Sequence, residues 1–135
     1  MNQQERFELV YDSGETLLKN GAEVKRVEST IIHVAQTFEL ENFDSYVSIH
    51  GIFLTATPYN KNVQAKVRDT PLSPTSLGRI DAINTLSRHI TEGKIDPYEA
   101  RKQLTMIQLL ASFIVTIAFA IFIVESSAVR NYLGI

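Results

Sequence analysis

The chain has 135 residues, which is enough for one domain with its own core and short for two. Its formal charge of −2 divides unevenly: residues 1–50 hold four basic and nine acidic side chains, and residues 51–135 hold nine basic and six acidic ones. The basic residues are scattered, which argues against a nucleic-acid partner. The absence of cysteine excludes disulfides, thiol nucleophiles and Cys-type zinc sites.

The first forty residues predict two amphipathic helices. Residues 4–20 carry apolar and small side chains at helical spacing, and Gly21 ends that helix. A second stripe predicts another helix over residues 22–39, and the two stripes are expected to pack together. The first stripe is Phe7, Val10, Tyr11, Gly14, Leu17, Leu18 and Gly21, and the second is Val24, Val27, Ile31, Val34, Ala35 and Phe38.

The apolar period changes to two in the next segment. Alternating residues over 46–50, 52–57 and 63–68 are separated by turn residues at His50-Gly51 and at positions 60–62. This pattern predicts a three-stranded antiparallel meander. The stretch TPLSPTS that follows predicts a proline-bearing loop.

Two further helices follow the predicted sheet. The first has Ile80, Ile83, Ser87 and Ile90 on one face and ends at Gly93. The second restarts with Asp96 as N-cap, Pro97 at the first helical position and Glu99 where a capping-box acid belongs. It is expected to run unbroken into the apolar segment that follows, and the fold class is α+β.

That apolar segment, MIQLLASFIVTIAFAIFIV, covers residues 106–124 and contains no charge. As a helix it would reach roughly 29 Å, close to the thickness of a bilayer's hydrocarbon core. We therefore predict an α+β domain over residues 1–103, a C-terminal transmembrane helix over 104–124 and a short tail over 125–135. The alternative is a buried core helix, which the preceding 100 or so residues can hardly surround.

Three stretches in this order and approximate spacing carry a family resemblance: GAEVKRVESTI at residue 21, GIFLTA at residue 51, and INTLSRHITEGKIDPYEARKQL before the apolar segment. The chain resembles the N-terminal half of the threonine/serine exporter family. The resemblance implies a cytoplasmic α+β domain followed by a bundle of spans, paired with a second membrane half in the same chain or in a partner protein. It also implies export of threonine and serine, or of dicarboxylates such as succinate.

Members of that family continue into several further spans, whereas this sequence ends eleven residues after its apolar segment. We therefore expect that the chain alone does not transport, and that it depends on a partner membrane subunit or on further C-terminal spans. The expected partners are the lipid bilayer and that subunit, and self-association into a homo-oligomer is a further route to a bundle.

Two polar faces are candidate contact or solute-side surfaces, the alternative being solvated helix faces. They consist of Glu23, Arg26 and Thr30 on the second predicted helix, and of Asp81, Asn84 and Arg88 on the third. Within the apolar segment, small and polar residues recur every four positions and form a ridge of Gln108, Ser112, Thr116 and Ala120. Such a ridge is expected to face another helix of the membrane part.

The charges around the apolar segment predict its orientation. Arg88, Lys94, Arg101 and Lys102 precede it closely, whereas Arg130 alone follows. By the positive-inside rule the chain should sit in the cell membrane with its N-terminal domain cytoplasmic.

The sequence predicts no catalytic residue, cofactor or metal site. His33, His50 and His89 fall in different predicted elements, and no G-x-S-x-G or glycine-rich phosphate loop is present. The function predicted is that of a component of an exporter-like transporter. Two alternatives stay open: a tail-anchored cytoplasmic interaction module, and a hydrolase-like domain whose Ser, His and Asp meet only in space.

Overall fold

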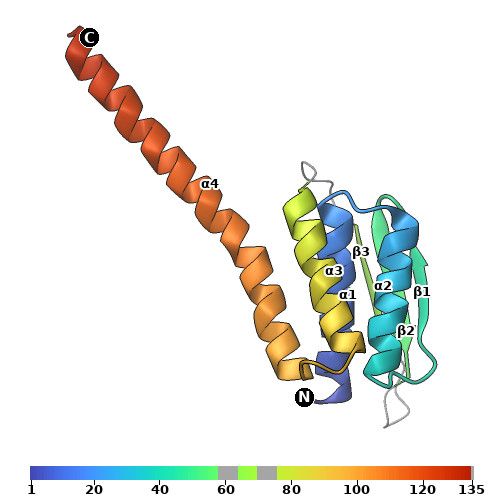
Figure 1. Ribbon diagram of the computed structural model, residues 1–135. Helices are drawn as coiled ribbons and strands as arrows, with labels where there is room; N and C mark the ends of the chain where they lie inside the picture. Colours follow the sequence, from blue (N-terminus) through green and yellow to red (C-terminus); the bar gives the residue numbers. More distant parts are fainter. Residues whose placement is uncertain (58–63, 70–75, 135) are drawn as a thin grey trace.

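The computed structural model describes residues 1–57, 64–69 and 76–134, without the side chains of 64–69, 110–116, 118–119, 126–129 and 131. Four helices and three strands follow one another in the order α1-α2-β1-β2-β3-α3-α4 (Figure 1). Their bounds are α1 Gln3–Lys19, α2 Val24–Thr37, β1 Asp44–Val47, β2 Gly51–Ala56, β3 Gln64–Asp69, α3 Leu77–Thr91 and α4 Pro97–Leu133. The predicted α+β class is confirmed.

The strands form one antiparallel sheet in the order β1-β2-β3, as the period of two predicted. Tyr46 pairs with Phe53, and Phe53 pairs with Val67 on the other side. The first strand ends at Val47, earlier than predicted. The Ser48 amide donates a hydrogen bond to the Gly51 carbonyl at 2.9 Å and so begins the turn. Ile49 therefore lies in the turn and is exposed. The turn predicted at 60–62 and residues 70–75 of the predicted loop lie outside the described residues.

Helices α1 and α2 pack on each other and against the sheet, and α3 packs against both helices (Figure 1). The predicted apolar stripes are buried with two exceptions: Gly21 is exposed and Val24 is half-buried. Gly21 instead follows the C-cap of α1, Asn20, with a φ of 86° that favours glycine. On α2, Thr30 joins the buried face, and on α3 Leu86 takes the place predicted for Ser87.

The start of α4 follows the predicted capping pattern. The Asp96 side chain accepts a hydrogen bond from the Glu99 amide at 2.8 Å, and Pro97 occupies the first turn. Ala100 and Leu104 are fully buried, so the first two turns of α4 belong to the core of the domain. Gly93, with a φ of 67°, follows the end of α3 as predicted.

Helix α4 runs unbroken for 37 residues, or about 55 Å, and its second half projects from the domain (Figure 1). Within the part of the chain that the structure describes, however, no helix has the length and apolar character needed to cross a membrane. The transmembrane helix predicted over 104–124 is therefore not shown, although the segment is helical as expected. The side chains of residues 110–116 and 118–119, which carry much of the apolar run, lie outside the description.

Candidate functional site

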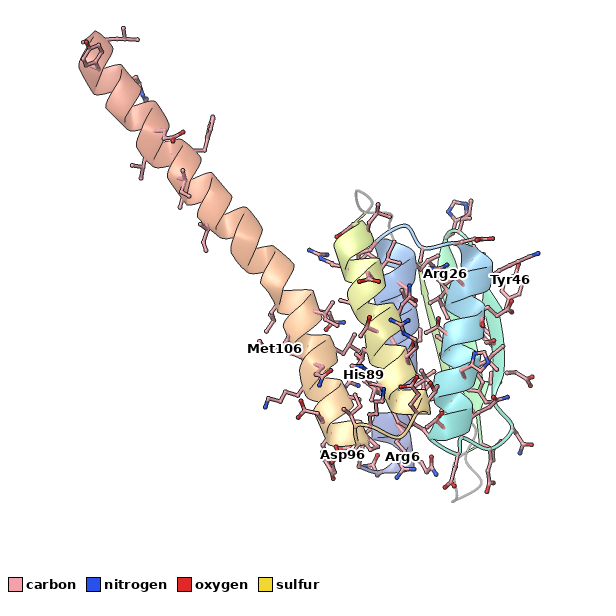
Figure 2. All side chains as sticks on the ribbon, viewed as in Figure 1. Arg6, Arg26, Tyr46, His89, Asp96 and Met106 are labelled. Atoms are coloured by element: carbon pink, nitrogen blue, oxygen red, sulfur yellow. The ribbon has the colours of Figure 1, made fainter. Side chains whose placement is uncertain are left out.

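The structure splits the first set of predicted site residues. Glu23 is the exposed N-cap residue of α2, and its side chain makes no capping hydrogen bond. Arg26 is exposed on the first turn (Figure 2), whereas Thr30 is buried. The reason is spacing: Thr30 lies three residues after buried Val27 and four before buried Val34, on the same side of the helix. Of the three predicted residues, therefore, only Glu23 and Arg26 present polar groups to solvent.

The second set stays together on α3. Asp81 and Arg88 are exposed and Asn84 is half-buried. The Arg88 guanidinium does not reach the other two residues of the set in any hydrogen bond that the structure describes; its Nη2 donates to Thr85 Oγ1 at 3.1 Å. Among the described side chains, no hydrogen bond or ion pair joins this set to Glu23 or Arg26. The two polar faces do not form one site.

A buried polar cluster that the sequence did not predict ties the end of α1 to the start of α3. The Asn20 side chain is only 1% exposed. Its Nδ2 donates to the Thr16 carbonyl at 2.7 Å, and its Oδ1 accepts from Arg79 Nη1 at 3.1 Å. The Asn20 carbonyl also accepts from the Ser76 amide at 3.1 Å. In the sequence, the signal that could have indicated this cluster was Asn20, which stands directly before Gly21 at the end of the helix.

Polar contacts also hold α4 beside α1. The Arg101 guanidinium lies 2.6 Å from the Asp12 carboxylate, with both side chains roughly a third exposed or less. Further along, Gln108 Nε2 donates to Thr16 Oγ1 at 2.9 Å. Gln108 was predicted to face another helix of the membrane part, and the partner that the structure shows for it is α1 of its own domain. Of the remaining ridge residues, Ala120 is exposed, and the side chains of Ser112 and Thr116 lie outside the description.

A groove of about 490 Å³ lies between α3 and α4. Leu86, Met106 and Ile107 supply apolar walls, and His89 and Lys102 supply polar ones. Figure 2 labels His89 on α3 and Met106 on α4, on opposite sides of this groove. On α4, Lys102 and Met106 lie four residues apart, as do Gln103 and Ile107, so one face of that helix forms the groove wall.

The described residues offer no constellation for metal or nucleophilic chemistry. Within the described ranges, no three His, Asp or Glu side chains gather as metal ligands. Ser29 Oγ lies 3.4 Å from His33 Nδ1, but both side chains are exposed on successive turns of α2. His50 sits in the β1–β2 turn, where its amide donates to Ser48 Oγ at 3.2 Å. The three histidines therefore lie apart, as their sequence positions predicted.

Comparison with known protein families gives a match over most of the chain. The model of the family described as a threonine/serine exporter, ThrE, matches residues 8–131, which is most of the chain. A search of curated proteins found no match, and a search of solved structures found none either.

Proposed function

The chain belongs to the threonine/serine exporter family, and on that premise we propose that it works as one component of an amino-acid or dicarboxylate exporter. In this proposal the α+β domain is the cytoplasmic part, and the projecting half of α4 meets the bilayer and the other helices of the transporter. No bond-breaking step is assigned to the chain. The observation that carries the proposal is the apolar surface of α4 beyond the domain.

That surface is formed by large apolar side chains among the described residues of the projecting half. Ile117, Ile121, Phe122, Ile123 and Val124 are all between 49% and 66% exposed. An apolar surface of this kind marks contact with lipid or with another protein. The described polar contacts between α4 and α1 are the ion pair of Arg101 with Asp12 and the hydrogen bond of Gln108 to Thr16, both in the first half of α4.

Contact with the bilayer is tested by extracting membranes with alkaline carbonate. Phe122→Asp should shift most of the chain from the membrane pellet to the supernatant, because a charge in hydrocarbon is costly. Leu77→Asp is the matched control, since Leu77 is 76% exposed but lies at the start of α3. If both variants stay in the pellet, or both leave it, the proposed role of α4 is wrong.

The ridge residues beyond Gln108 are proposed to contact a partner helix. Small residues allow close approach of two helices, and a hydroxyl can bond across the interface for about 0.6–2 kcal/mol. Ser112→Leu and Thr116→Leu together should abolish co-purification with a partner membrane subunit, while Ile117→Leu should not. Unchanged co-purification of the double variant would remove the ridge from the interface.

The cytoplasmic position of the domain is supported by charge. Lys94, Arg101 and Lys102 precede the apolar segment, and Arg130 follows it. A cysteine placed at Ser127 should react with a membrane-impermeant maleimide added outside intact cells. Reaction only after permeabilisation would place the tail inside and reject this orientation.

Transport itself is tested in liposomes loaded with labelled threonine, serine or succinate. A solute path needs several helices to surround it, because unsatisfied polar groups cost several kcal/mol each in hydrocarbon. The chain alone should therefore give no saturable efflux, and efflux should require a partner membrane subunit. Saturable efflux by the chain alone would reject the role of a dependent component. No efflux with any partner subunit would reject the transport function.

A further inference from the structure

The groove between α3 and α4 has an apolar floor that leads toward the projecting part of α4. Leu86 is 3% exposed at its base, and Ile107 is half-buried against the core. Met106 lines the same groove and is 53% exposed, and Leu109, one turn further along α4, is 57% exposed. The apolar lining therefore extends from the base of the groove to exposed apolar side chains on α4, as the path of an acyl chain would need to do.

The polar part of the groove carries an excess of positive charge. The Lys102 side chain lines it and is exposed. The Arg88 guanidinium is held at Thr85, another lining residue, by the hydrogen bond of 3.1 Å. The only acid among the lining residues, Glu99, accepts a hydrogen bond from Gln103 Nε2 at 3.1 Å and so is already engaged. The nearby Glu92 carboxylate, which the charges of His89 and Arg88 also reach, is paired with Lys94 at 2.6 Å. With that pair neutral, Lys102 and Arg88 stand at the groove against the single carboxylate of Glu99, which favours an anionic group there.

We propose that this groove binds one anionic amphiphile, an acyl chain that carries a phosphate or carboxylate head. Lys102 and Arg88 would contact the head, and Leu86, Met106 and Ile107 would contact the chain. A volume near 490 Å³ falls in the range of small-molecule sites, about 300–1,000 Å³. Free threonine or serine is far smaller and polar over most of its surface, so it would leave the apolar floor uncovered. The proposal does not depend on transport and extends beyond the function proposed above.

The experiment uses the two methionines of the chain as reporters. Met106 lines the groove, and Met1 lies at the other end of the chain beside Tyr98. The full chain is labelled with ¹³C-methyl methionine and held in a neutral detergent. Dodecyl phosphate, dodecanoate, phosphatidylglycerol and phosphatidylcholine are then titrated separately. We expect a saturable shift of the Met106 methyl signal with the anionic probes and none with phosphatidylcholine, while the Met1 signal stays in place.

Two lysine variants make the test specific. Lys102→Gln should weaken binding about tenfold, and Lys25→Gln, an exposed lysine on α2, should leave it unchanged. A response to phosphatidylglycerol alone identifies a lipid, and a response to dodecanoate alone identifies a fatty acid; both support an anionic amphiphile. The inference is overturned by equal shifts with phosphatidylcholine, by no saturable shift, or by equal affinities of the two variants. A saturable shift with free threonine, serine or succinate, and none with the amphiphiles, overturns it as well.

Discussion

Gly14 of α1 lies close against side chains of α2 and β2. A Cβ added there would lie 2.7 Å from Ile31 Cγ2 and 3.2 Å from Ile52 Cδ1. Both isoleucines are at most 1% exposed. Neither methyl group can move away without repacking the core, because the surrounding side chains fill the space around it. We therefore predict that Gly14→Ala destabilises the domain.

Two opposing effects set the size of that change. Overpacking a filled core costs roughly 1–3 kcal/mol, and alanine is favoured over glycine inside a helix by about 1 kcal/mol. The net loss in the free energy of unfolding should be about 1 kcal/mol. For an m-value of about 1–3 kcal/mol/M in urea, the unfolding midpoint should fall by roughly 0.3–1 M.

Urea unfolding followed by circular dichroism, on the full chain in one neutral detergent, measures this midpoint. Gly78→Ala is the control, because no described atom beyond its chain neighbours and its own helix backbone lies within 4 Å of its added Cβ, and its midpoint should stay equal to that of the unmodified chain or rise. A double-mutant cycle of Gly14→Ala with Ile31→Ala should show coupling of about 1 kcal/mol, since the second change removes the clashing methyl. A midpoint for Gly14→Ala at or above the unmodified one, together with zero coupling, would refute the steric argument.

Three smaller effects follow from single contacts. Asn20→Ala removes a buried amide and one partner of Arg79, and it should lower the free energy of unfolding by about 1–3 kcal/mol in the same assay. Asp96→Ala removes the N-cap of α4 and should cost about 1 kcal/mol, while Asp96→Asn should cost less. The hydrogen bond from Lys94, and then its charge, hold the pKa of Glu92 below 4.5, so this pair stabilises the fold above that pH and stops doing so as the carboxylate is protonated. In Lys94→Gln, a carboxyl titration by NMR should place the pKa of Glu92 closer to 4.5; an unchanged value would contradict the assigned cause.

The helices and the sheet were predictable because their apolar periods differ and their ends carry specific residues. Asp96 and Pro97 fixed the start of α4, and Gly93 fixed the end of α3, since each residue type has a defined role at a helix end. The end of β1 was not predictable in this way. Ile49 continues the alternation, but the turn from Ser48 to Gly51 takes it out of the strand, so the local hydrogen bonds outweighed the pattern.

The candidate site was less predictable, because a helical wheel drawn for one helix does not say how wide its buried face is. Thr30 was placed with Glu23 on a polar face, yet α2 packs against α1, α3 and β1 and so buries more than one stripe. The contacts between α1 and α4 join residues about 90 positions apart, such as Asp12 with Arg101. No periodicity within either helix specifies such a pair, which depends on how the helices pack.

Gln108 shows how this packing changes the interpretation of α4. A polar side chain inside an apolar run needs a hydrogen-bonding partner where it is buried in lipid or against another helix. Gln108 is exposed in the structure, and its amide still bonds to Thr16. The sequence could not distinguish a partner in another membrane helix from one in the domain. Helices α1 and α4 run in the same direction, since Met1, Asp12 and Thr16 bond in that order to Tyr98, Arg101 and Gln108. The contacts of α4 with the domain therefore extend past residue 103 as far as Gln108, and the ridge proposed to face a partner helix begins beyond that residue.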